Sequence, residues 1–439
     1  MIKVFAAVFL TLCATIAQAM PDIKTFTTPA GTPAWLVEDH NIPFVALELR
    51  FIGGTSMDPM DKRGVTKFMM GLLEEGSGEL DAQAFSIAKD DLAASFEYGA
   101  YADVLTVSAK FLTENQDQAI DLLRQSLSDP SFDSASIERV RAQIVSGIKS
   151  KAQDPSDIAS AAFNSEAYPD HPYGSDDLGT LETIGTISAE DIIQAHKVGL
   201  TKDRVIVAAV GDITTEELGI LVDQLLEALP ESQETQMPSY VSDALKSGVK
   251  VIEFPNPQAT ILFGHSGIAR NDDDFFAAYL LNHVLGGSGF ESRLMSEVRE
   301  KRGLTYGIGS FLASRRYGDL IIGQVATANE TVAQTIDVIT QEWQKIGKFG
   351  VTEAELQAAK TYLTGAYPLR FDGNGPIANI LAGMQFQGLS PDYIKTRNDR
   401  LNAVTLEDIQ RVANRLFHAD QLRFVVVGQP EGLDDLQKN

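Results

Sequence analysis

Apolar and polar residues in the first half of the chain follow two spacings, one typical of strands and the other typical of helices. Short apolar or alternating runs predict strands at residues 34–37, 45–51 and 104–111. Segments in which apolar residues recur every three or four positions predict helices at residues 64–75, 115–127, 137–151 and 215–229. Strands and helical runs in this order indicate an α+β fold, with a mixed or antiparallel sheet and helices packed on one face.

The same plan occurs twice along the chain. Ser188 precedes two acidic residues and a helical run, and a β-branched strand then ends at Gly211. Thr405 and Gly428 take the same places 217 positions later. A hydroxyl side chain followed by acidic residues is typical of a helix N-terminus. The shared spacing of cap, helix and strand predicts two homologous domains.

A second echo pairs residues 63–67 with residues 302–306, which lie 239 positions apart, so loop lengths differ between the copies. Residues 230–244 are polar, contain two prolines and show no periodicity, as is typical of a linker. The predicted organisation is a signal peptide at 1–19, an N-terminal domain at 20–229, a linker at 230–246 and a C-terminal domain at 247–439.

Residues 1–19 have the pattern of a secretory signal. Lys3 precedes an apolar run at 4–16, and Ala17 and Ala19 form a small-x-small cleavage site. The run is too short for a permanent membrane anchor. We therefore expect a periplasmic protein. Cys13 is the only cysteine, so cleavage leaves a chain with no disulfide or cysteine-based metal site.

Composition narrows the function classes. The chain has 439 residues, 44% of them hydrophobic and 22% charged, as in ordinary globular proteins. Its formal net charge of −24, without a local basic run, argues against nucleic-acid binding because the phosphate backbone would be repelled. No apolar run after the leader reaches the ~20 residues of a membrane span.

Several segments carry a family resemblance. They are Gly53–Ser56, the helix at 64–77, His171–Gly174, the glycine-rich run at 285–294 and Val298–Tyr306. The last reads V-R-E-K-R-G-L-T-Y and is similar to a V-R-E-K-x-G-L-x-Y block. Together they resemble the insulinase/pitrilysin family of inverted-zincin metallopeptidases, in its bacterial and mitochondrial processing-peptidase branch. The resemblance covers essentially the whole chain after the leader.

The resemblance implies that the zinc site is degenerate. The family's H-x-x-E-H aligns with Lys67, Met70 and Gly71, and its third ligand aligns with Gly147. An ammonium, a thioether and a hydrogen atom cannot replace two imidazoles and a general base. We therefore expect no metal and no cofactor on this chain, and no peptidase activity from the chain alone.

Arg299 and Tyr306 match the family's pattern, in contrast to the zinc-ligand positions. The resemblance implies that Arg299 and Tyr306 would contact a substrate in the zinc site of a partner, where a guanidinium and a phenol can bind peptide oxygens. The alternative is that Arg299 pairs with Glu297 or Glu300 and that Tyr306 covers a core edge.

The glycine-rich run allows two interpretations. Gly286, Gly287 and Gly289 permit close backbone approach, which suits a hinge or substrate-binding peptide loop, or a plain turn at a helix start. A phosphate-binding loop is disfavoured because the run lacks the Lys-Ser/Thr ending.

These observations favour a zinc-free, peptide-binding subunit of a heterodimeric peptidase. Such a chain would form half of a clam-shell chamber and supply Arg299 and Tyr306 to a homologous subunit that carries H-x-x-E-H and zinc, with unfolded peptides as substrates. The main alternative is a peptide-binding or scaffolding protein with no hydrolytic role. An independent metallopeptidase with unorthodox ligands is the third hypothesis.

Overall fold

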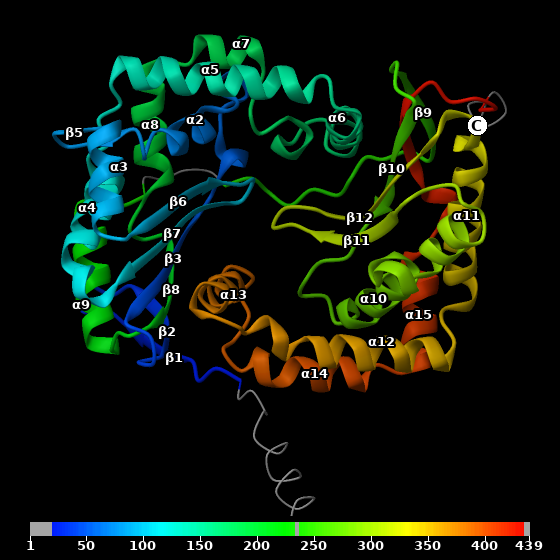
Figure 1. Cartoon of the computed structure of the whole chain (residues 1–439). Helices are drawn as coiled ribbons and strands as arrows, with labels where there is room; N and C mark the ends of the chain where they lie inside the picture. Colours follow the sequence, from blue (N-terminus) through cyan, green and yellow to red (C-terminus); the bar gives the residue numbers. More distant parts are fainter. Residues whose placement is uncertain (1–19, 233–236, 434–439) are drawn as a thin grey trace, which may run out of the picture.

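Two halves of similar construction face each other across the molecule (Figure 1). The structure is a computed structural model that describes residues 20–232 and 237–433. The predicted signal peptide lies outside the described residues. No helix in these two ranges is long and apolar enough to cross a bilayer.

The N-terminal half contains a six-stranded mixed sheet with the order β1-β2-β8-β3-β7-β6. Strands β2 and β8 are parallel, and every other neighbouring pair is antiparallel. The strands are β1 (Lys24–Thr27), β2 (Pro33–Glu38), β3 (Phe44–Ile52), β6 (Ser95–Ala100), β7 (Val104–Leu112) and β8 (Val205–Gly211). A small hairpin, β4 (Gly76–Ser77) and β5 (Leu80–Asp81), stands apart.

The C-terminal half repeats this topology in a five-stranded sheet with the order β11-β12-β10-β13-β9. Its one parallel pair is β13 with β9, which corresponds to β8 with β2. The strands are β9 (Gly248–Glu253), β10 (Gln258–Ser266), β11 (Ile308–Ser314), β12 (Asp319–Ala328) and β13 (Arg423–Gly428). The predicted α+β fold with two homologous halves is confirmed.

Helices cover the outer face of each sheet, and the main cores lie between helices and sheet (Figure 1). The N-terminal half contains α2 (Val65–Gly71), α3 (Ala82–Asp91), α4 (Gln116–Ser128), α5 (Ser134–Lys151), α6 (Pro155–Ala167), α7 (Leu181–Thr186), α8 (Ala189–Gly199) and α9 (Thr215–Leu226). The C-terminal half contains α10 (Phe275–Asn282), α11 (Val332–Phe349), α12 (Glu353–Ala366), α13 (Asn374–Phe386), α14 (Tyr393–Ala403) and α15 (Leu406–Leu416).

The predicted helix caps are present in both copies. The Ser188 and Thr405 side chains each accept a hydrogen bond from the backbone N–H three residues later. In turn, the Asp191 and Asp408 side chains accept a hydrogen bond from the backbone N–H of the capping residue. Strands β8 and β13 end at Gly211 and Gly428. At Gly211, φ is +145° and a Cβ would lie 2.2 Å from the Phe44 carbonyl oxygen, so a side chain does not fit there.

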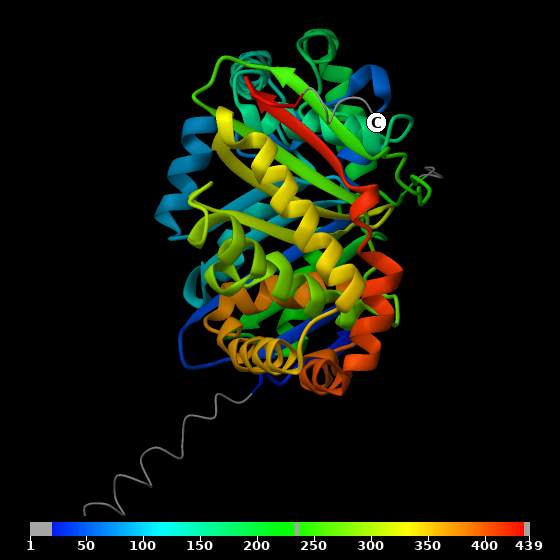
Figure 2. The ribbon, with the colours of Figure 1, turned by 90° about the vertical axis from the view of Figure 1, so that its right-hand side faces the viewer.

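One helix from each half packs on the sheet of the other half (Figure 1). Figure 2 shows the opposite arrangement for α11, in yellow, which lies across the outer face of the sheet of its own half. Helix α6 packs Phe163 and its neighbours on the inner face of β10, β12 and β13. Helix α13 packs Ala378 and Ala382 on Ala46 and Ala208 of the N-terminal sheet. We call this pair the exchanged helices. The sequence predicted helices on one face only; the exchanged helices add partial cover on the second face.

The described parts of the expected linker, residues 230–232 and 237–246, contain no helix or strand. The linker is nevertheless attached to both halves. Val241 donates its N–H to the Tyr317 carbonyl, and Ala244 donates to the Ala167 carbonyl. The positions of the domain boundaries stay a prediction.

Candidate functional site

Helix α2 carries the positions at which the family's zinc ligands were expected. It begins after Gly64, whose φ of +95° and close approach to the Leu178 carbonyl suit glycine alone. The Lys67 ammonium lies 2.8 Å from Asp177 on the loop before α7. Lys151 of α5 pairs with the adjacent Asp176 at 2.7 Å. Two cations and two carboxylates therefore occupy this side of α2, and the Lys67 ammonium adds positive charge where a dication would need electron-pair donors.

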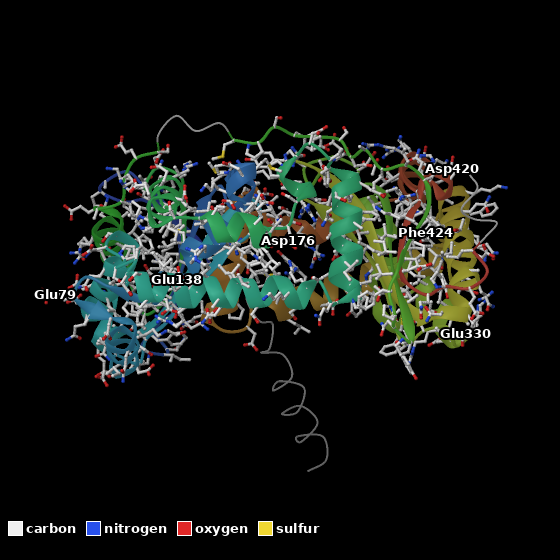
Figure 3. The ribbon with its side chains drawn as sticks, turned by 90° about the horizontal axis from the view of Figure 1, so that it is seen from above. Glu79, Glu138, Asp176, Glu330, Asp420 and Phe424 are labelled. Carbon is white, nitrogen blue, oxygen red and sulfur yellow. The ribbon has the colours of Figure 1, made fainter. Side chains whose placement is uncertain are left out.

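Figure 3 shows Asp176 in the view from above, between the N-terminal half, marked by Glu138, and the C-terminal sheet, marked by Phe424. The loop that carries Asp176 and Asp177 thus lies where the two halves approach each other.

The remaining ligand positions have lost their donors. Met70 is 2% exposed and belongs to the hydrophobic core of the N-terminal half. Gly71 faces Val140 of α5, and Gly147 of α5 faces Leu178. Packing between α2 and α5 therefore fills the site with apolar contacts instead of ligands.

The start of α2 is held by a buried carboxylate. Asp58 accepts hydrogen bonds from the Gly64 N–H at 2.9 Å and from the Thr66 hydroxyl. Its partner Arg63 is 4% exposed, lies 3.9 Å away and donates to the carbonyls of Thr55 and Pro172. Burial raises the pKa of Asp58 to about 6, against the opposing effects of the Thr66 bond and the Arg63 charge. Burial also lowers the pKa of Arg63.

No group of three or more His, Cys, Asp or Glu side chains within residues 20–232 and 237–433 could hold a metal ion. Two of the buried histidines, His196 and His265, have hydrogen-bond partners in the core. The His265 Nε2 accepts a 2.8 Å bond from the Trp343 indole, and burial lowers the pKa of His265 to about 4. His196 bonds the Leu127 carbonyl at 2.7 Å.

The first prediction concerns metal content. We expect the purified chain, stripped with a chelator and then exposed to zinc, to retain far less than one zinc per chain, because the expected site offers no ligand set. Metal analysis by mass spectrometry checks this. A relative with an intact H-x-x-E-H is the positive control, and stoichiometric zinc on this chain would contradict the prediction.

Arg299 and Tyr306 lie in a different environment. Arg299 is on a π-helical turn, Met295–Glu300, and its guanidinium stacks 4.7 Å from the Phe290 ring. Glu297, one of its expected partners, pairs instead with Lys301 and Arg302. Tyr306 is 87% exposed, so it does not cover a core edge.

Neither the Arg299 nor the Tyr306 side chain forms a hydrogen bond or an ion pair with the described residues. In particular, no such bond connects the pair with Lys67 on α2. The structure places both side chains free to contact another molecule.

The glycine-rich run forms the end of a π-helical segment, His283–Gly287, and the following turn. A Cβ at Gly286 would lie 2.4 Å from the Ser310 hydroxyl of β11, so this glycine permits tight packing on the sheet. Gly287 approaches Asn282, and Gly289, with φ of +60°, has open space around it. Close packing accounts for Gly286, whereas Gly289 is needed for the turn.

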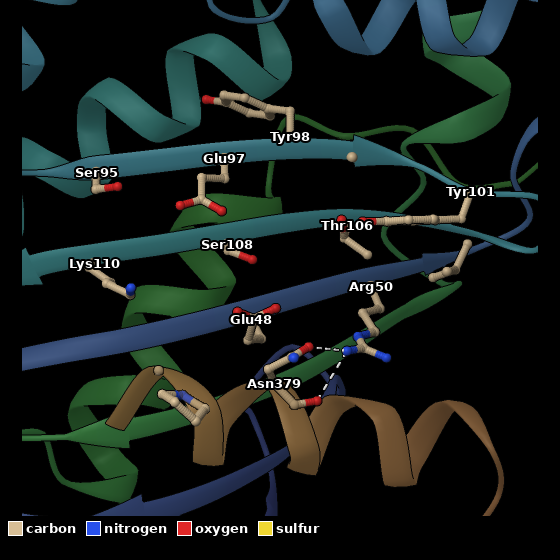
Figure 4. Close-up of a pocket in the computed structure, with 14 residues that line it drawn as sticks. Glu48, Arg50, Ser95, Glu97, Tyr98, Tyr101, Thr106, Ser108, Lys110 and Asn379 are labelled. Carbon is tan, nitrogen blue, oxygen red and sulfur yellow. Dashed lines mark hydrogen bonds between the residues drawn. The ribbon is translucent and has the colours of Figure 1, made fainter. Parts of the chain in front are cut away.

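The inner face of the N-terminal sheet forms a polar hollow of about 690 Å³ beside α13 (Figure 4). Glu48 and Arg50 of β3 project into it, and Arg50 donates to the Asn379 carbonyl of α13 at 3.0 Å. Burial raises the pKa of Glu48 and lowers the pKa of Arg50. This face was not predicted from the sequence. Leu47, Leu49 and Phe51 alternate with these polar residues, and this alternation could have predicted a polar second face of the strand.

Comparisons with known proteins agree with this geometry. The family model for insulinase, peptidase family M16, matches residues 34–181, and that for the peptidase M16 inactive domain matches residues 186–363. The chain is 25% identical over 399 residues to the Helicobacter pylori non-peptidase homolog YmxG, covering 91% of this chain and 92% of that protein.

It is also 23% identical over 400 residues to the mitochondrial-processing peptidase subunit beta of Neurospora crassa, covering 87% of this chain and 83% of that one. A crystal structure of a peptidase M16 inactive domain from Pseudomonas fluorescens superposes with a TM-score of 0.86 and 29% identity, covering 94% of this chain and 98% of that chain. The two family models match consecutive parts of the chain, along two structurally equivalent halves. The chain therefore belongs to the insulinase (M16) peptidase family, as a non-catalytic member.

Proposed function

We propose that this chain is the non-catalytic, peptide-binding subunit of a heterodimeric zinc peptidase in the periplasm, and that it contributes Arg299 and Tyr306 to the active site of a zinc-bearing homologous subunit. The observation that carries the proposal is the contrast between two sites. The zinc-ligand positions are filled by an ion pair and core packing. The Arg/Tyr pair is left without intramolecular polar partners in the described chain.

The chemistry suits a contribution to a partner's site. A guanidinium offers several fixed donors to peptide carbonyls, and a phenol can donate to an oxygen on which negative charge develops. Stacking of Arg299 on Phe290 orients the guanidinium without neutralising its charge. The positive charge therefore stays available to a substrate.

The test is a mixing experiment with a zinc-bearing relative that carries H-x-x-E-H. We expect the two chains to form a complex and Arg299→Ala to lower kcat/KM for peptide cleavage by about 10²-fold, as when one transition-state donor is lost. Peptide-cleavage kinetics measure the effect, while light scattering after size exclusion confirms that the complex still forms.

Arg302→Ala is the matched control. Arg302 lies next to the same turn and pairs with Glu297 at the surface, so its loss should change cleavage by no more than about twofold. Absence of a complex would contradict the proposal, as would an Arg299→Ala complex with unchanged cleavage. A stable homodimer that binds peptides without a zinc-bearing partner would support the scaffolding alternative.

A further inference from the structure

A second hollow, of about 340 Å³, lies between Arg50 of β3 and the helices of the C-terminal half. Four arginines line it: Arg50, Arg270, Arg370 and Arg397. None of the described residues that line this hollow is acidic. This composition is the reverse of the whole chain, whose formal net charge is −24. We call this hollow the arginine pocket.

None of the four arginines has a carboxylate partner among the described residues. Arg397 is only 6% exposed, donates to the Leu363 carbonyl and stacks 4.4 Å from the Tyr367 ring. Arg270 donates to the Tyr393 hydroxyl and lies 4.1 Å from the Phe275 ring. These contacts hold the guanidinium planes in place while leaving their positive charges uncompensated.

Nearby carboxylates are occupied elsewhere. Asp272 and Asp274 follow Arg270 on the same loop, yet they pair with Arg415 and Arg411 of α15. Arg50 keeps a buried Nε without a hydrogen-bond partner in the described chain. Arg397 is buried without an ion-pair partner among the described residues, and like charges that line one pocket repel each other, so the free protein maintains this arrangement at a cost in stability. An anionic ligand would relieve both costs.

The pocket shares lining residues with three larger hollows, one of which, of about 530 Å³, also contains Asp272, Asp273, Asp274 and Asp408. It shares Arg50 and Asn379 with the polar hollow of Figure 4, and it shares Arg270 with a hollow of about 740 Å³ between the halves. Arg315 and Arg316 line this third hollow, where they stack on Tyr173 and Phe386. Across the arginine pocket, the polar hollow of Figure 4 and the hollow between the halves, seven cationic side chains face four carboxyl groups. Space of this extent suits an extended chain better than a single small anion.

We propose that the arginine pocket binds carboxylate side chains of an acidic peptide segment. Planar guanidinium groups match carboxylates in two-point geometry, and the flanking aromatic rings pack on the aliphatic stems of glutamate side chains. This inference goes beyond the proposed function, because it assigns a separate binding site and does not involve Arg299 or Tyr306.

The test measures binding of a fluorescein-labelled hexaglutamate peptide to the isolated full chain by fluorescence anisotropy. Hexaglutamine and hexalysine are the comparison probes. We expect hexaglutamate to bind and the other two to bind at least about tenfold more weakly, with affinity falling as salt is added. Equal binding of hexaglutamine and hexaglutamate would overturn the proposal.

Variants locate the site. Arg270→Gln and Arg370→Gln should each weaken hexaglutamate binding about tenfold or more, because each removes a charge-assisted donor. Arg370 is exposed, so its replacement is compatible with folding, which circular dichroism verifies. Arg124→Gln, which alters a surface arginine on α4, is the matched control and should leave affinity unchanged. An equal loss in the control would overturn the assignment.

Two further measurements distinguish the arginine pocket from the Arg299 site and from a phosphate site. Arg299→Ala should leave hexaglutamate binding unchanged, so failure of the heterodimer proposal and failure of this one are distinguishable. Inorganic phosphate is titrated as a competitor. If phosphate saturates the arginine pocket and hexaglutamate does not compete, the site takes a small oxyanion and the peptide assignment is overturned.

Discussion

Asp58→Ala is expected to destabilise the chain by about 3–5 kcal/mol, because it removes the ion-pair partner of the buried Arg63. The Asp58 side chain is fully buried, and it also receives the hydrogen bonds that start α2. Without the carboxylate, the Gly64 N–H and the Thr66 hydroxyl lose their acceptor. Urea-induced unfolding followed by circular dichroism measures the change in the free energy of unfolding.

Asp121→Ala provides the control for this experiment. Asp121 forms an exposed ion pair with Arg124 one helical turn away, and such pairs contribute at most about 1 kcal/mol. If the two alanine variants were equally stable, the Asp58–Arg63 pair would not be the element that fixes the N-terminus of α2, and the prediction would be wrong.

Phe163→Ala is expected to lower the free energy of unfolding by about 3–5 kcal/mol. Phe163 is fully buried and belongs to α6, but it packs with Leu262, Ile322 and Val425 of the C-terminal sheet. Removal of the ring leaves a cavity between parts of the chain that are far apart in sequence. Urea unfolding monitored by both circular dichroism and tryptophan fluorescence provides the measurement.

The two probes also distinguish how the halves are coupled. Because α6 joins the two sheets, we expect both signals to shift together in one transition. Phe349→Ala, at a phenylalanine that is 65% exposed, should change stability by less than about 1 kcal/mol. Two separate transitions for Phe163→Ala, with only one of them shifted, would contradict the coupling.

The strands and helices that local patterns predicted in the first half are present, but their ends were predicted less well. The caps at Ser188 and Thr405 were visible because a hydroxyl followed by acids has a short-range physical cause. Helix α2 was predicted to reach residue 75 but ends at Gly71. Leu72 and Leu73 are buried beyond its end, so the apolar pattern continues where the helix does not.

Long-range features could not be predicted in the same way. The stripe of Ala159, Phe163 and Ala167 marks a buried helix face, but nothing in its spacing identifies a sheet that begins some ninety positions later. The four pocket arginines come from separate segments, so only the fold brings them together. The degenerate zinc positions followed from the family resemblance, whereas the Lys67–Asp177 pair depends on a loop.

The exchanged helices determine what would happen if the chain were cut. A protease that cleaves within residues 230–246 would sever the peptide chain but not the packing of α6 and α13. The two fragments should stay associated through native gel filtration. If each fragment were synthesised separately, its sheet would expose apolar residues that the other half's helix normally covers, and its own exchanged helix would lack the sheet on which it packs. Such fragments should therefore be poorly soluble alone and reconstitute a folded molecule when co-expressed, like the two pieces of a split protein.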